Sequence, residues 1–80
     1  MTLLHVATVV RPCEIHAKDC VSAIDLPDGT HLDLSGRPEV IAARTLPKAR
    51  VTVVAFLDRD AVAWPESVTV TVHRRKAVAA

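Results

Sequence analysis

Aromatic residues and glycine are scarce in this 80-residue sequence, which has one Phe, one Trp, no Tyr and two Gly. Proteins that bind single-stranded nucleic acid usually stack bases on several aromatic side chains, and this chain has two. A nucleophilic enzyme needs an oxyanion hole and close backbone approach to its substrate, for which two glycines are few. The composition therefore predicts a protein that is not an enzyme.

Long apolar runs are also absent from the sequence. The best candidate, residues 3–10, is too short to span a bilayer, has no basic segment before it, and is followed by Arg11 and Pro12 instead of a small-residue cleavage site. We therefore expect a soluble, unprocessed chain with no membrane partner, located in the cytoplasm or in a virion.

Half of the residues are apolar, and Ala and Val dominate that half, so the core must be built from small side chains. A chain of this length buries only about 60% of the surface of its unfolded form, so its stability is marginal unless a partner subunit supplements the core. These limits predict one β-rich domain over residues 1–76 that assembles with other chains, and a loose tail at residues 77–80.

Two stretches, residues 50–57 and 67–73, alternate β-branched residues with a period of two, which is typical of strands. In the second stretch the valines share one face, and hydroxyl groups share the other face with His73. The first stretch is apolar on both faces except for Thr52, which indicates a strand covered on both sides.

Further strands are expected nearer the N-terminus. Residues 3–10 predict a strand that is buried or covered by a partner. Two apolar stretches flank a Pro-Asp-Gly sequence, whose turn preferences predict a hairpin. The pleat of that hairpin places Asp25, His31 and Asp33 together on one face.

Residues 38–45 are ambiguous, because so short a run can form either a turn or two of helix after Pro38 or a strand. Residues 61–64 predict one more short strand. The predicted fold class is therefore mainly β: a small single-domain antiparallel sheet, sandwich or barrel of about five to seven short strands, with at most one short helix near residues 38–45.

Cys13, His16 and Cys20 form the one cluster with recognisable metal chemistry. Two thiolates and an imidazole could occupy three corners of a tetrahedral zinc site, with His5 or His31 as the fourth ligand. The sequence lacks the paired knuckles of common zinc modules, so it favours two reduced cysteines and no cofactor over zinc or a disulfide. Cys13 with His16, and His31 with its two acidic neighbours, are weak catalytic candidates, for which a solvated polar face is the simpler interpretation.

Charge is distributed unevenly along the chain. The net charge of +1 excludes strong overall steering toward nucleic acid, but residues 1–36 carry a net −3 and residues 37–80 a net +4. We expect the two halves to neutralise each other within one small domain. A phosphate-binding stripe forms if the C-terminal basic residues lie beside the basic residues in the middle of the chain; the stripe would comprise Arg44, Lys48, Arg50, Arg74, Arg75 and Lys76.

These observations predict a structural or adaptor subunit that acts by protein–protein contact in an oligomeric assembly. A virion component, such as a capsid-decorating or minor structural protein, is one example that fits the size and composition. Leu3, Phe56 and Trp64 are the expected interface anchors, because large apolar side chains dominate interface energetics. The alternative is a small regulatory module that binds nucleic acid through the basic stripe, with zinc supporting its fold.

Overall fold

The computed structural model describes the backbone of residues 2–78 and the side chains of residues 6–74. Over these residues the chain is mainly β, which confirms the predicted fold class. Seven strands and one 3-10 turn follow one another along the chain: β1 (Thr2–Val10), η1 (Pro12–Glu14), β2 (Cys20–Asp25), β3 (His31–Asp33), β4 (Val40–Leu46), β5 (Val51–Phe56), β6 (Val62–Pro65) and β7 (Thr69–Val78).

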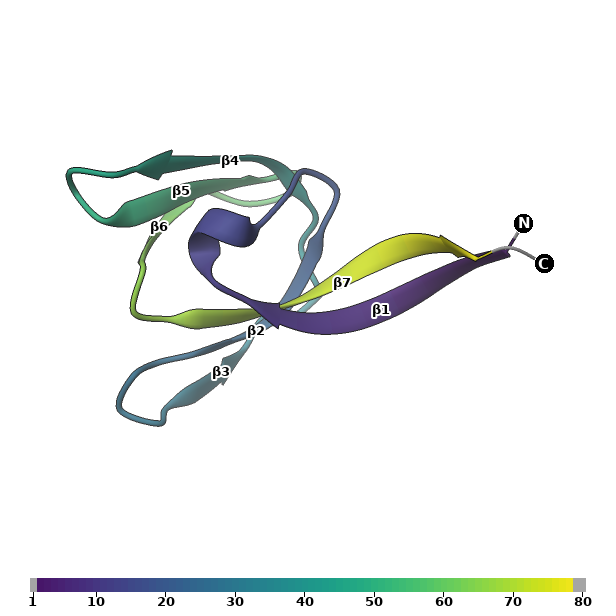
Figure 1. The fold of residues 1–80 in the computed structure, drawn as a ribbon, viewed down its shortest axis with the longest axis horizontal. Helices are drawn as coiled ribbons and strands as arrows, with labels where there is room; N and C mark the ends of the chain where they lie inside the picture. Colours follow the sequence, from purple (N-terminus) through teal and green to yellow (C-terminus); the bar gives the residue numbers. More distant parts are fainter. Residues whose placement is uncertain (1, 79–80) are drawn as a thin grey trace.

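The strands form two antiparallel sheets, with the orders β1-β7-β2-β3 and β4-β5-β6 (Figure 1). Residues 38–40 join the sheets through backbone hydrogen bonds. Lys18 N–H donates to the carbonyl of Val40 at 2.7 Å, and Leu57 N–H donates to the carbonyl of Glu39 at 3.0 Å. A bridge between Cys20 and Glu39 adds to this seam, so the two sheets face each other across one core.

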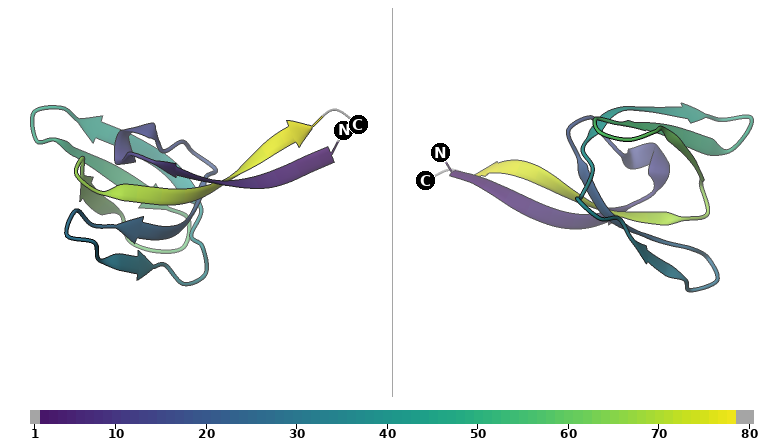
Figure 2. Two further views of the ribbon diagram at one scale, coloured as in Figure 1. Left: turned by 60° about the horizontal axis from the view of Figure 1, so that its bottom comes forward. Right: turned by 180° about the vertical axis from the view of Figure 1, so that it is seen from behind.

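A two-stranded ribbon projects from this body (Figures 1 and 2). The first half of β7 pairs with β2 on one side and β1 on the other, and its last pair with β2 is at His73. From Arg74 to Val78, β7 pairs only with β1. The ribbon accounts for the elongated outline of the molecule, 43 × 25 × 22 Å, and β7 continues two residues into the segment predicted as a loose tail.

Branched aliphatic side chains fill the core between the sheets. Six valines are at most 1% exposed, and Phe56 meets Trp64 edge to face with ring centroids 5.9 Å apart. The two aromatic residues are thus core residues in this chain, which corrects the expectation that they anchor an interface. The side chain of the third expected anchor, Leu3, lies outside the described residues. The six valines are Val21, Val40, Val54, Val68, Val70 and Val72.

The strand predictions succeed for β7 and are revised for three other segments. The hydroxyl-bearing face of β7 points away from the core as expected, because its alternate valines are buried. The ambiguous residues 38–45 contribute to a strand, β4, rather than a short helix, since they pair with β5. Within the single chain neither β1 nor β5 is covered on both faces: Val9 is 62% exposed, and the second face of β5 is half-buried. For β1, cover by a partner stays a prediction.

Trp64→Ala should lower the free energy of unfolding by about 3 to 5 kcal/mol, because it removes a buried indole and leaves a cavity beside Phe56. Leu57→Ala is the matched control: Leu57 follows β5 in the same sheet but is 67% exposed, so its loss should cost less than about 0.5 kcal/mol. Urea denaturation of both variants measures the difference. Equal losses would show that Trp64 does not belong to the core.

Candidate protein-interaction site

The outer face of the β4-β5-β6 sheet, the side turned away from the core, is the most unusual surface of the described chain. Alternation along β5 points Thr52, Val54 and Phe56 into the core and the intervening residues outward. The strand register then places other apolar residues beside them. The outer face comprises Ile41, Ala42, Arg44, Leu46, Val51, Val53, Ala55, Leu57, Ala63 and Pro65.

Two large side chains stand out at one end of the outer face. Ile41 is 51% exposed and Leu57 is 67% exposed. Ile41 occupies the β-bulge between Val40 and Ala42, where one extra residue turns an additional side chain outward. Arg44 carries the one charged side chain of the face, so the surface is apolar almost throughout.

The outer face of the sheet that contains β7 carries more polar side chains. There Thr69, Thr71 and His73 are exposed or half-buried, as expected for a sheet with one face in water. Val9, the register partner of Thr71, is the exposed large apolar residue of that face, whereas the outer face of the β4-β5-β6 sheet is apolar almost throughout. No segment among residues 6–74 buries Ile41 or Leu57, so the face remains open in the single chain.

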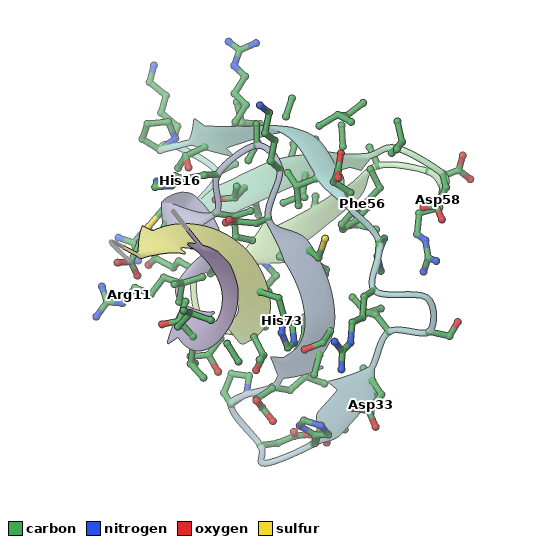
Figure 3. The ribbon with its side chains drawn as sticks, turned by 90° about the vertical axis from the view of Figure 1, so that its right-hand side faces the viewer. Arg11, His16, Asp33, Phe56, Asp58 and His73 are labelled. Carbon is green, nitrogen blue, oxygen red and sulfur yellow. The ribbon has the colours of Figure 1, made fainter. Side chains whose placement is uncertain are left out.

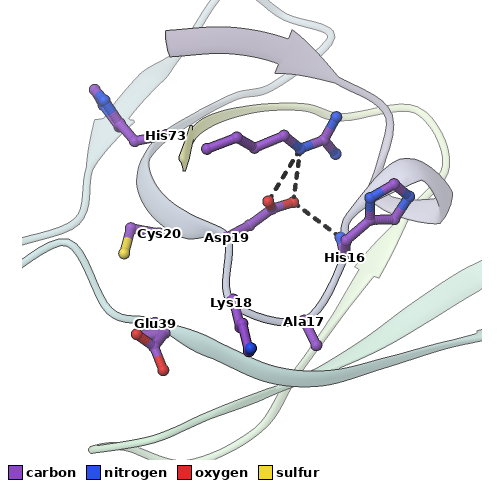
Figure 4. A pocket seen from close by; sticks show the side chains of 8 residues that line it. His16, Ala17, Lys18, Asp19, Cys20, Glu39 and His73 are labelled. Atoms are coloured by element: carbon purple, nitrogen blue, oxygen red, sulfur yellow. Dashed lines mark hydrogen bonds and ion pairs between the residues drawn. The ribbon is translucent and has the colours of Figure 1, made fainter. Parts of the chain in front are cut away.

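A second feature is a hollow of about 480 Å³ at the base of the ribbon (Figure 4). At its centre Asp19, only 4% exposed, accepts bonds from the guanidinium Nε of Arg74 at 3.0 and 3.1 Å and from the backbone N–H of His16 at 2.9 Å. Arg74 Nη2 also donates to the carbonyl of Glu14 at 2.6 Å. These bonds tie β7, where it enters the ribbon, to the segment before β2.

The hydrogen bonds in the hollow connect separate segments of the fold. Cys20 and His73 are register partners, but their side chains point in different directions (Figure 4). Within residues 6–74 no hydrogen bond joins them into a nucleophile and base pair. The ion pair between Asp19 and Arg74 also joins the acidic half of the chain to the basic half inside one domain. Sequence patterns carry no signal for this pair, because 55 residues separate its members.

The zinc candidates do not converge. Cys13 is exposed on η1 and lines a different hollow, beside β7, whereas His16 and Cys20 line the hollow at the base of the ribbon. Both cysteines are free thiols. In the part of the chain that the structure describes, no three His, Cys, Asp or Glu side chains gather closely enough to hold a metal ion.

The β2-β3 hairpin brings His31 between two carboxylates, on the face that the pleat predicted. His31 Nδ1 lies 2.6 Å from Asp25 Oδ1, and Nε2 lies 3.0 Å from Asp33 Oδ1. The hydrogen bond to Asp25, then that to Asp33, raises the pKa of His31 above its ordinary value, because both ring nitrogens can donate only in the charged form. The three side chains are 41% to 83% exposed, and Figure 3 shows Asp33 well below Phe56, toward the bottom of that view.

The basic residues are divided between two distant regions. Arg44, Lys48 and Arg50 belong to the β4-β5 hairpin, whereas the other three follow one another along the ribbon portion of β7. The hairpin turn and the ribbon point to opposite ends of the molecule (Figures 1 and 2). Arg74 is engaged by Asp19, and the side chains of Arg75 and Lys76 lie outside the described residues.

Comparison with known protein families, with curated protein sequences and with solved structures finds no match to this chain. In residues 2–78 there is no helix of the length and hydrophobicity that a membrane span requires. The surfaces described above are therefore the basis for proposing a function.

Asp19→Ala should lower the free energy of unfolding by about 2 to 3 kcal/mol, because it leaves the half-buried guanidinium of Arg74 and the N–H of His16 without their acceptor. Asp60→Ala, in the exposed β5-β6 loop, is the matched control and should be nearly neutral. Chemical denaturation measures both. Amide exchange of Arg74 should also accelerate in Asp19→Ala, and unchanged exchange would contradict a role for Asp19 at the ribbon base.

The pKa of His31, followed by NMR titration, should lie above the ordinary value of about 6.5 and should fall on Asp25→Asn. A raised pKa in the folded state means that protonated His31 stabilises the fold below the unfolded pKa, and that this contribution disappears as the pH rises through the folded pKa. Asp58→Asn removes a carboxylate from a distant loop and should leave the titration unchanged. An unshifted His31 in the wild-type chain would contradict the hydrogen bonds to the ring.

Proposed function

We propose that this protein is a non-enzymatic structural or adaptor subunit that binds another protein chain through the outer face of the β4-β5-β6 sheet. The observation that carries the proposal is the pairing of two exposed large side chains, Ile41 and Leu57, with an otherwise apolar sheet face. A partner of matching chemistry presents an apolar, largely uncharged surface, with an acidic group placed to meet Arg44.

The energetic argument starts from the small size of the domain. Its core consists mainly of valines, so burial of further apolar surface against a partner adds substantially to a marginal free energy of folding. Burying an exposed Leu or Ile contributes about 1.5 to 3 kcal/mol each. A protein that functioned alone would gain solubility from polar groups at these two positions. This chain has such polar groups on the outward face of β7.

A large assembly, a virion particle or a cytoplasmic complex, is the setting that such a subunit fits. Nucleic-acid binding is the weaker proposal, because the two groups of basic residues lie at opposite ends of the molecule and its two aromatic side chains are buried. Bases would find neither a stacking platform nor a continuous cationic track on the described surface.

The double variant Ile41→Ser/Leu57→Ser tests the proposal. In an extract of the source cells, the tagged wild-type chain should sediment in a stoichiometric complex larger than a dimer. The double variant should bind its partner at least about tenfold more weakly, because two anchors are lost, while retaining the thermal stability of the free domain within a few degrees.

Leu32→Ser is the matched control for this experiment. Leu32 is 46% exposed, but it lies on β3 in the other sheet, so its replacement should leave the complex intact. Recovery of the wild-type chain as a free monomer or a simple homodimer would contradict the proposed function. So would an equal loss of binding in Leu32→Ser and in the double variant.

A further inference from the structure

The two sheets have four edge strands, and three of them carry features that prevent pairing with another strand. β3 is only three residues long and carries charged groups. β4 is interrupted by a bulge and contains Arg44, and β6 has four residues and ends on Pro65. Short length, bulges, charges and proline are the usual means by which proteins block edge-to-edge association.

β1 has none of these protections. It runs for nine residues, contains no Asp, Glu, Lys, Arg or Pro, and keeps an uninterrupted register with β7 from Thr2 to Val10. Within residues 2–78, β7 is its one neighbour in the sheet, so alternate N–H and C=O groups of β1 face outward along the ribbon (Figure 2). Its side chains at Val6 and Val9 are 41% and 62% exposed.

We infer that β1 pairs antiparallel with β1 of a second copy of this chain, about a two-fold axis that passes beside Val6. Val6 is the middle residue of the strand, so this axis gives the full nine-residue overlap and places Val6 directly opposite its symmetry mate. Because a two-fold axis perpendicular to the sheet keeps each residue on its own face, the core face of one copy continues into the core face of the other.

The partner strand belongs to a second copy of this chain, because β1 can pair with an identical strand. β1 contains no Asp, Glu, Lys or Arg, and in this register its one ionisable residue, His5, pairs with Ala7 of the copy. The pairing therefore sets no like charges directly opposite each other, and the copy supplies a partner of equal length. The pairing also closes. The combined sheet reads β3-β2-β7-β1-β1-β7-β2-β3, and both of its outer edges are the short, charged β3, so the assembly stops at a dimer.

This dimer is independent of the outer face of the β4-β5-β6 sheet, because β1 and that face belong to different sheets. A dimer therefore presents two copies of the outer face to its partners. The two interfaces can be tested separately, and a result that contradicts the β1 pairing does not contradict the proposed function of the outer face.

Sedimentation equilibrium of the purified chain provides the test, over about 1 to 500 µM, a range that covers weak and moderate dimers. The wild-type chain should dimerise. Val6→Glu should raise the dimer dissociation constant at least about tenfold, because it sets two carboxylates opposite each other across the axis. Within the monomer the new carboxylate lies opposite Arg74 in the register of β1 and β7, so the ribbon is retained.

Charge reversal identifies the register. Val6→Lys should also lose the homodimer, and an equimolar mixture of Val6→Glu and Val6→Lys should restore a heterodimer tighter than either variant forms alone. Val6→Thr, which keeps a β-branched neutral side chain, and Leu57→Lys, on the outer face, are controls that should dimerise like the wild type. In the wild-type dimer, mixed isotope labelling should show NOEs between the Val6 residues of the two copies.

Several results would overturn the inference. A wild-type chain that stays monomeric over the whole range has no β1 pairing. If Val6→Glu dimerises as strongly as the wild-type chain, the dimer contact does not lie at Val6. The same holds if the mixture of Val6→Glu and Val6→Lys fails to associate. Loss of the dimer in Leu57→Lys, with the dimer intact in Val6→Glu, assigns self-association to the outer face of the β4-β5-β6 sheet.

Discussion

The period-two alternation of β7, combined with hydrogen bonding on both of its edges, is the constraint on which the rest of the structure depends. It places Val70 and Val72 against the opposite sheet, and the pairing on both sides leaves those valines no alternative register. The same strand then continues past the body and forms half of the ribbon. Core, sheet order and projecting ribbon all follow from this one strand.

A core made of small side chains has consequences for the surface. Valine fills less volume than Leu or Phe, so Phe56 and Trp64 of the opposite sheet fill core space that the valines leave, and they are not free to anchor contacts. On the outer face of the β4-β5-β6 sheet the exposed large side chains are Ile41 and Leu57, at the margin of β4 and β5. The domain therefore buries its aromatic residues in the core and leaves aliphatic ones on the surface.

The two proposed interfaces differ in their physical basis. The outer face of the β4-β5-β6 sheet relies on burial of apolar area, which is nondirectional and accepts a partner of varied shape. The β1 edge relies on backbone hydrogen bonds, which are directional and require a strand in register. The Asp19–Arg74 ion pair at the base of the ribbon holds β7 in place beside that edge.

Local patterns in the sequence were sufficient for most of the strands, for the β2-β3 hairpin and for the mainly β class, because alternation and turn chemistry depend on neighbouring residues. The sequence also indicated that residues 50–57 are apolar on both faces. Leu57, at the end of that stretch, is one of the exposed residues in the structure. Tertiary structure alone decided the rest. Pairing with β5 determined that the ambiguous residues 38–45 contribute to a strand, β4, and packing of the two sheets buried Trp64. The fold also placed Cys13 and Cys20 in different hollows and brought Asp19 into contact with Arg74. Each of these outcomes depends on contacts between residues far apart in the chain, and no local pattern specifies which strand edges meet.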